Sequence, residues 1–225
     1  HYAERASQLL LKKMPQGQPL GVKIPTTSLL IPFWKKICDQ LDISLSVVIA
    51  LRNPVSVATS VEESFEDLPE KSLWIWISSL LSSLIHSEGH ERVLVDYDEL
   101  IKNPSRQMER VAGALNLKID EEQLRSYSAH FIDPSLRHQF FPNYHFANHD
   151  LCLQLAVEIY DALLAVAMDQ KLFSDLQKPL QKWSKVFASV QGLLTIFEMH
   201  EFTIATLVDL NLELRNSLSL SKDKT

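Results

Sequence analysis

SLSVVIALRNP, residues 44–54, is the stretch of sequence that decides the fold. Its first eight residues form a nearly continuous run of aliphatic and β-branched side chains, which is typical of a strand buried on both faces. Arg52-Asn53-Pro54 follows at once. Asn53 is a good helix N-cap and Pro54 a good first helical residue, so we expect a helix from here to about Phe65.

Short apolar runs and helical patterns alternate along the first part of the chain. RVLVD at Arg92–Asp96 predicts a second buried strand, and the apolar run Leu20–Ile24 is a candidate third strand. Glu70–Ser87 predicts a helix because its apolar residues recur at spacings of three and four. Strands separated by helices indicate an α/β fold, with a parallel sheet and helices on both faces. Further helices are expected over Tyr2–Met14, Leu29–Leu41, Pro104–Leu115 and Glu121–His130, with a long loop over Ile132–Asn148.

The last part of the chain adds helices only. We therefore expect an α/β domain over residues 1–148 and a C-terminal helical region over 149–225. An apolar stripe between Ser174 and Ser219 predicts a helical hairpin packed on the α/β domain. The alternatives are a dimer seam, which would make the protein a homodimer, and a connector to a fused module.

Composition and charge limit the class of protein. The 225 residues are 46% hydrophobic and 22% charged, which is typical of a globular chain rather than a disordered one. The net charge of −6 argues against a nucleic-acid binder. No uninterrupted apolar run reaches the roughly 20 residues that span a bilayer. The two cysteines, Cys38 and Cys152, cannot form a disulfide framework, so we expect a reduced, cytoplasmic setting.

The junction between the first strand and its helix is a candidate anion site. In open α/β sheets ligands bind beyond the carboxyl ends of the strands, and Arg52 lies at such an end. The N-terminus of the following helix favours an anion, and Ser60 lies roughly 10 Å further along that helix. A guanidinium and a hydroxyl placed in this way would hold a phosphate from two sides. The alternative is an Arg52 that pairs with a surface carboxylate and a Ser60 that is only a small helical residue.

Two segments carry a resemblance to a known family. The pattern R-x-P-x-x-x-x-x-S after a buried strand, here Arg52, Pro54 and Ser60, resembles the 3′-phosphate-binding motif of sulfotransferases that use 3′-phosphoadenosine 5′-phosphosulfate (PAPS). Downstream, RVLVDYDELIKNPSRQMERVAGALNL at Arg92–Leu117 is similar to the strand, tyrosine motif and Pro-led helix of the same family.

Two shorter segments extend the resemblance. VKIPT at Val22–Thr26 resembles a Lys-x-Pro segment that precedes a helix in relatives, and FIDPSLRH at Phe131–His138 looks like bacterial members of the family. The resemblance implies a sheet of the P-loop-like sulfotransferase type. It also implies transfer of a sulfonate from PAPS to a hydroxyl acceptor, with carbohydrates as one acceptor class and adenosine 3′,5′-bisphosphate as the product.

The resemblance assigns roles to individual residues. Arg52 and Ser60 would hold the 3′-phosphate, and Arg137 would be a second phosphate ligand. Tyr97 would lie near the adenine, with a core tyrosine that anchors the loop as the alternative. Lys23 would face the sulfonate or the acceptor, with a solvated lysine beside a strand as the alternative.

The general base and the 5′-phosphosulfate loop are harder to find in the sequence. Proton removal from an acceptor hydroxyl needs a His or Glu, and His138 and His145 are candidates because functional groups concentrate on loops. Surface histidines are the alternative, and the His spacing fits no metal signature. The five glycines match neither a Walker loop nor a Ser-Gly-Thr turn. We therefore expect this chain, which starts with His1, to lack the N-terminal 5′-phosphosulfate loop and to be a poor catalyst alone.

Two rival functions remain open from the sequence. The first is a nucleotide kinase-like protein built on the same type of sheet. The second is a non-catalytic helical interaction module in which Arg52 is merely structural. Preference for adenosine 3′,5′-bisphosphate over ATP would separate the sulfotransferase hypothesis from both.

Overall fold

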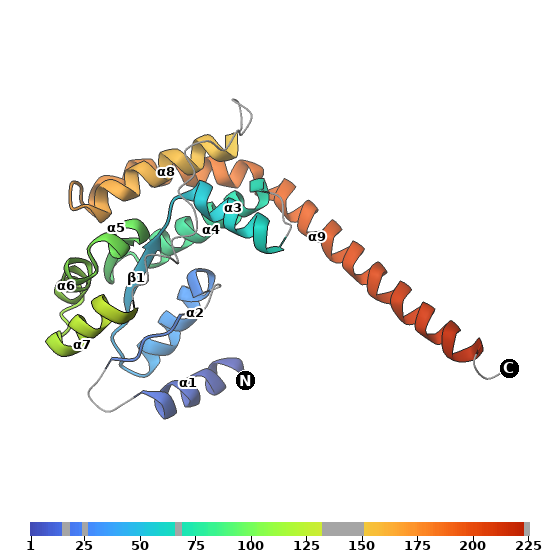
Figure 1. The fold of residues 1–225 in the computed structure, drawn as a ribbon, viewed down its shortest axis with the longest axis horizontal. Helices are drawn as coiled ribbons and strands as arrows, with labels where there is room; N and C mark the ends of the chain where they lie inside the picture. Colours follow the sequence, from blue (N-terminus) through green and yellow to red (C-terminus); the bar gives the residue numbers. More distant parts are fainter. Residues whose placement is uncertain (15–18, 24–26, 66–68, 132–150, 223–225) are drawn as a thin grey trace. The chain divides into compact units, whose positions relative to one another are not determined.

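The computed structural model describes residues 1–14, 19–23, 27–65, 69–131 and 151–222. The chain forms two compact units, His1–Pro179 and Leu180–Thr225 (Figure 1). Among the described helices, none combines the length and the apolar character that a bilayer-spanning segment needs.

The first unit contains a small parallel sheet. Strand β1 (Ser46–Leu51) pairs with β2 (Glu91–Asp96), and the register runs from Ser46 opposite Glu91 to Leu51 opposite Asp96. Helices α3 (Pro54–Phe65) and α4 (Pro69–His86) form the crossover that a parallel pair requires. The two strands and both crossover helices are confirmed within two residues of their predicted ends, so the unit is an α/β structure rich in helices.

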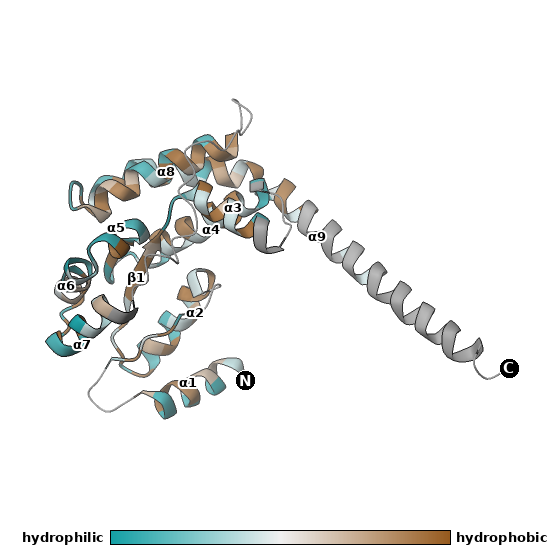
Figure 2. Cartoon of the chain, viewed as in Figure 1, coloured by the Kyte–Doolittle hydropathy of each residue, from teal (hydrophilic) through white to brown (hydrophobic). Residues whose placement is uncertain are grey.

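The two strands differ in burial. In β1, Leu51 is fully buried whereas Val48 keeps 51% of its surface exposed, so the prediction that β1 is buried on both faces is wrong. In β2, successive residues Val93, Leu94 and Val95 are all buried. The reason is that α5 (Tyr97–Lys102), α6 (Pro104–Ala114) and α8 (Leu151–Ala167) all pack against β2. Figure 2 shows β1 as a largely apolar strand.

The predicted third strand does not form. Residues 20–23 of this run have neither helical nor strand structure, and both Leu20 and Val22 are exposed. An apolar run of this length needs a neighbouring strand or a packed core to become a sheet strand, and burial is missing here. Two further helices precede β1, namely α1 (Tyr2–Lys13) and α2 (Thr27–Gln40).

Helix α4 is the centre of the helical packing in this unit. It packs against α2, α3 and α8. Its stripe at spacings of three and four is confirmed, because Ile77, Leu81 and Leu84 are all buried. Helix α7 (Glu121–Ser126) begins after Asp120, whose carboxylate accepts hydrogen bonds from two backbone N–H groups, and continues as a π-helical turn over Tyr127–Phe131.

Three helix ends use Asp or Asn where glycine is usual. Asp42, Asn116 and Asp169 have φ angles of 54°, 50° and 57°. After each of them the next N–H bonds back five residues, from Ile43 to Cys38, from Leu117 to Ala112 and from Gln170 to Ala165. These are Schellman C-caps, whose left-handed residue is most often glycine. This use of Asp and Asn fits a chain with only five glycines.

The end of the chain is one helix where a hairpin was expected. Helix α9 runs without a break from Gln177 to Lys222, and its 46 residues correspond to about 69 Å of helix. A short 3-10 turn, η3 (Phe173–Leu176), precedes it. The predicted boundary lies after residue 148, whereas the first compact unit extends to Pro179 and includes α8, which packs against the sheet.

Candidate functional site

The carboxyl edge of the sheet brings two of the predicted site residues, Arg52 and Tyr97, together. Leu51 pairs with Asp96, so the residues that follow them, Arg52 and Tyr97, leave the sheet at the same edge. Both side chains are half-buried. This edge is the place where parallel α/β sheets bind ligands.

Arg52 lies over the ring of Tyr97. The guanidinium carbon is 4.9 Å from the ring centroid, which is within the range of a cation–π interaction. The backbone oxygen of Arg52 accepts a hydrogen bond of 3.2 Å from the indole N–H of Trp76 on α4. The hydrogen bond from Trp76 therefore holds the backbone at the end of β1, and the Tyr97 ring holds the Arg52 side chain.

The start of α3 follows the capping pattern that the sequence predicts. Asn53 Oδ1 accepts hydrogen bonds from the N–H groups of Val55 (3.0 Å) and Ser56 (3.2 Å). Pro54 is the first helical residue and is buried. This cap orients the positive end of the α3 dipole at the strand end that carries Arg52. Ser60, in the second turn of α3, is half-buried.

Asp96 is a buried carboxylate that the sequence analysis did not single out. It keeps only 2% of its surface exposed. Its Oδ1 accepts a 3.0 Å hydrogen bond from the N–H of Glu99 and so caps α5, and its Oδ2 accepts a 3.3 Å bond from the hydroxyl of Tyr160 on α8. Burial raises the pKa of Asp96, and burial together with the Asp96 charge raises the pKa of Tyr160. Asp96 could have been found from the sequence, because an Asp between a buried strand and a helix is a typical N-cap signal. Tyr160 could not, because it meets Asp96 only through tertiary packing.

The other predicted site residues fall into two groups. Lys23 lies in the irregular segment before α2 and is exposed. Lys23 is thus solvated, as in the alternative interpretation, but the described residues beside it form no strand. Arg137, His138 and His145 lie outside the described residues.

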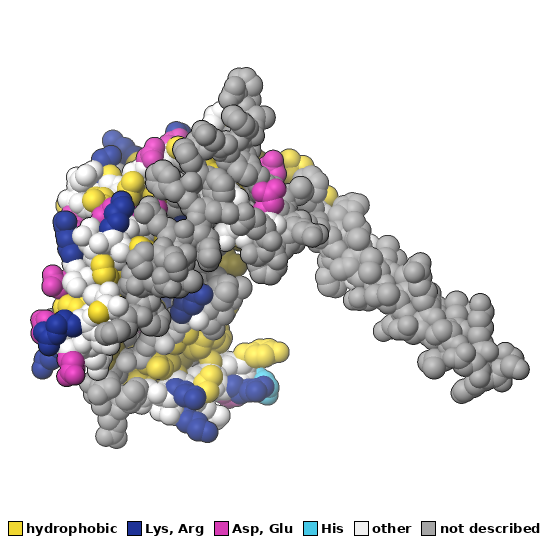
Figure 3. Space-filling model, viewed as in Figure 1, with side chains coloured by type: hydrophobic (Ala, Val, Ile, Leu, Met, Phe, Trp, Pro, Cys, Tyr) yellow, Lys and Arg dark blue, Asp and Glu magenta, His cyan; other side chains and the backbone are white. Residues whose placement is uncertain are grey.

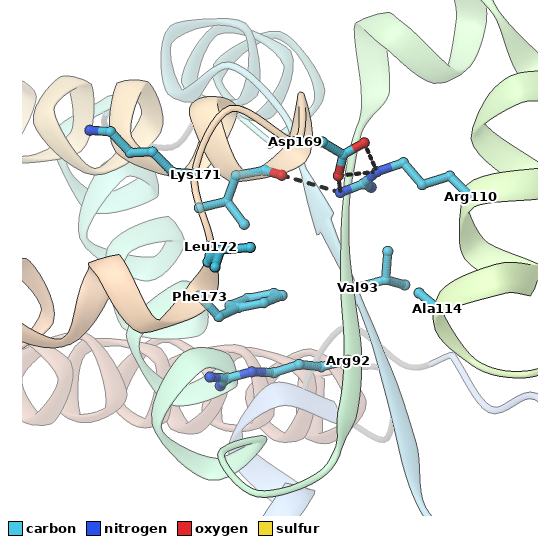
Figure 4. A pocket seen from close by; sticks show the side chains of 9 residues that line it. Arg92, Val93, Arg110, Ala114, Asp169, Lys171, Leu172 and Phe173 are labelled. Atoms are coloured by element: carbon cyan, nitrogen blue, oxygen red, sulfur yellow. Dashed lines mark hydrogen bonds and ion pairs between the residues drawn. The ribbon is translucent and has the colours of Figure 1, made fainter.

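A separate pocket of about 210 Å³ lies near the amino end of β2 (Figure 4). On one side of the pocket, Nε of Arg110 on α6 donates to both carboxylate oxygens of Asp169 at 2.8 and 2.9 Å. The two terminal nitrogens of the same guanidinium donate to the backbone oxygens of Leu94 and Val166. The Arg110 guanidinium holds the pKa of Asp169 below its usual range. This arginine therefore ties β2 to the end of α8.

The second arginine of this pocket is also engaged with protein groups. Arg92 donates to the Leu84 oxygen (2.8 Å) and to Ser87 Oγ (3.2 Å), and its guanidinium lies 4.3 Å from the Phe173 ring centroid. Figure 4 shows Lys171 pointing away from the Arg110–Asp169 pair. With both guanidinium groups bonded to the protein, this pocket is best explained as a structural junction.

A third location has an apolar surface beside positive charge. The surface of α1 and α2 carries exposed apolar side chains near Lys and Arg (Figure 3). A hollow of about 370 Å³ there is lined by Arg5, Lys12 and Trp34 among others. It contains none of the residues predicted for the site.

The described part of the chain shows no cluster of three His, Cys, Asp or Glu side chains arranged to hold a metal ion. Cys38 and Cys152 are both buried free thiols, and burial raises the pKa of Cys38. Comparison with known proteins found no protein-family model and no solved structure that matches the chain. The carboxyl edge of the sheet is therefore the part of the structure from which a function is proposed.

Proposed function

We propose that this chain is a sulfotransferase-like protein of bacterial type, which binds PAPS at the carboxyl edge of its parallel sheet. One observation supports the proposal above others. Arg52 directly follows the carboxyl end of β1 and precedes the capped N-terminus of α3, and its guanidinium lies over the Tyr97 ring at the same edge of the sheet. We infer that one anion is bound by the Arg52 guanidinium and the Ser60 hydroxyl and is stabilised by the positive end of the α3 dipole, since the first α3 N–H groups already donate to Asn53.

The proposed ligand group is the 3′-phosphate of an adenine nucleotide. A guanidinium fork matches two phosphate oxygens, whereas a serine hydroxyl supplies one neutral donor. A nucleotide with a 3′-phosphate is thereby distinguished from one without it. The sheet would then be of the P-loop-like sulfotransferase type.

The proposed reaction moves a sulfonate from PAPS to a hydroxyl group, with carbohydrate hydroxyls as one acceptor class. The bond between sulfur and the bridging phosphate oxygen breaks, and a bond between sulfur and the acceptor oxygen forms. The hydroxyl proton goes to a base, and His138 and His145 stay the predicted candidates. The leaving group is adenosine 3′,5′-bisphosphate. Arg52 and Ser60 act by fixing the nucleotide, so their contribution is to orient the donor.

Calorimetric titration of the chain with adenosine 3′,5′-bisphosphate, AMP and ATP tests the proposal. We expect tighter binding of the bisphosphate than of AMP, which lacks the 3′-phosphate. Arg52→Gln should weaken bisphosphate binding by about 10- to 100-fold, because it removes a charge-assisted hydrogen-bonding group. The matched control is Arg125→Gln, an exposed arginine in the last turn of α7, which should leave the affinity unchanged.

The same titrations separate the rival functions. Tighter binding of ATP than of the bisphosphate, unchanged in Arg52→Gln, would favour the nucleotide kinase-like hypothesis. Absence of binding to any of the three nucleotides by well-folded protein would favour the helical interaction module and would contradict the proposal.

A further inference from the structure

We propose that Tyr97 serves the nucleotide site through Arg52: its ring is a support that holds the guanidinium toward the 3′-phosphate position. The inference rests on the proposed function and deepens it. It makes Tyr97 a positioning residue, in place of the adenine contact that the family resemblance implies.

The Arg52 side chain is long and flexible, so its conformation before ligand binding affects the affinity. A free arginine side chain populates many rotamers, and ordering it on ligand binding reduces the affinity. In this protein the guanidinium already lies 4.9 Å from the centre of an aromatic ring. Stacking on that face restricts the side chain before any ligand arrives. The ring face that holds the guanidinium is also not open to a nucleotide base.

Both members of the stacked pair are themselves held. The backbone of Arg52 is fixed by the Trp76 indole, which donates to its oxygen. Tyr97 is the first residue of α5, and Asp96 directly before it caps that helix through the Glu99 N–H. Tyr160 donates to the other oxygen of the same carboxylate. The backbone that carries Tyr97 is therefore held by a hydrogen-bonded cap, and the Asp96 side chain of this cap is only 2% exposed.

The nearby charges are consistent with this arrangement. Asp96 faces the Tyr160 hydroxyl and the start of α5, and its carboxylate is occupied by these two donors. Arg52 is directed at the ring of Tyr97. The contact with Tyr97 is made to an aromatic ring and not to a carboxylate, so the N–H groups of Arg52 can donate hydrogen bonds to a phosphate.

Titrations of Tyr97 variants with adenosine 3′,5′-bisphosphate and AMP test the inference. Tyr97→Leu should weaken bisphosphate binding about 3- to 10-fold and leave AMP binding unchanged, because AMP has no 3′-phosphate for Arg52 to hold. Tyr97→Phe keeps the ring and should retain the wild-type affinity for both nucleotides. In an Arg52→Gln background, Tyr97→Leu should cause no further loss.

The outcomes are distinct. Equal loss of bisphosphate and AMP binding in Tyr97→Leu, or a loss that persists in the Arg52→Gln background, would assign Tyr97 to the base and overturn the inference while the proposed function stands. Equal binding of the two nucleotides by the wild-type protein would overturn both. Tyr97→Gln provides the same comparison if Tyr97→Leu does not fold, and circular dichroism of each variant verifies its fold.

Discussion

The hydrogen bond between Tyr160 and Asp96 predicts a pH-dependent loss of stability in Tyr160→Phe. Burial raises the pKa of Asp96 above its ordinary value of 3.8, whereas the Tyr160 hydroxyl stabilises the ionised form. The contribution of Asp96 to folding is therefore largest below its ordinary pKa and falls as pH rises through the raised pKa. Loss of the hydroxyl leaves a buried carboxylate oxygen without this donor. We expect a loss of about 1.5–3 kcal/mol at pH 7.5, the condition that favours ionised Asp96 more, and a smaller loss at pH 4, the condition that favours its protonated form.

Urea unfolding of the full chain, followed by circular dichroism at the two pH values, measures this effect. With a slope of about 2 kcal/mol/M, the midpoint of Tyr160→Phe should fall by about 1 M at pH 7.5 and by less at pH 4. The control is Tyr2→Phe, since Tyr2 is 80% exposed, and no change is expected. Asp96→Asn keeps a cap acceptor without the charge and should flatten the pH dependence. An equal loss at both pH values, or no loss, would refute the reasoning about Asp96.

Three further predictions concern the fold, and urea midpoints at pH 7.5 measure each one. Arg110→Met should destabilise the chain by about 2–4 kcal/mol, because it leaves Asp169 and two backbone oxygens without their donor. Arg110→Lys should recover part of this loss, and equal losses in the two variants would contradict the role of the guanidinium fork. Asn116→Ala should cost about 1 kcal/mol because alanine is strained at a φ of 50°, whereas Asn116→Gly should be at least as stable as the wild type; the reverse order would contradict the C-cap. Leu51→Ala should cost about 2–5 kcal/mol and Val48→Ala less than 1 kcal/mol, since only Leu51 is buried; similar losses would contradict the one-sided burial of β1.

The local signals of the sequence were sufficient for most elements of the first unit. The run that forms β1, the Asn53-Pro54 start of α3 and the stripe of α4 each combine a hydrophobic period with a capping or breaking residue. Such signals depend on the chain within a few residues of themselves. These elements can therefore be predicted without knowledge of the tertiary structure.

Burial and pairing were less predictable because they depend on distant segments. An apolar run alone does not reveal whether a neighbour covers it, and Leu20–Val22 shows the consequence, since these residues stay exposed. The same holds for β1, whose residue pattern suggested two covered faces. The unbroken α9 was missed because neither Pro179, which the first turn of a helix tolerates, nor the polar residues further along interrupt it.

The candidate site was predictable in part. Arg52 could be placed from the rule that ligands bind at the carboxyl ends of parallel strands, and Tyr97 from the second motif. Their stacking on one another could not be derived, because it follows from the register of Leu51 opposite Asp96. Tyr160 is 64 residues from its carboxylate partner, and no local pattern connects the two.

A crystal structure of the chain with adenosine 3′,5′-bisphosphate is the most direct test of the central claim. The account predicts the 3′-phosphate within about 2.7–3.0 Å of both the Arg52 guanidinium and the Ser60 hydroxyl. A nucleotide bound with its 3′-phosphate away from these two groups, for example in the pocket between Arg92 and Lys171, would contradict it.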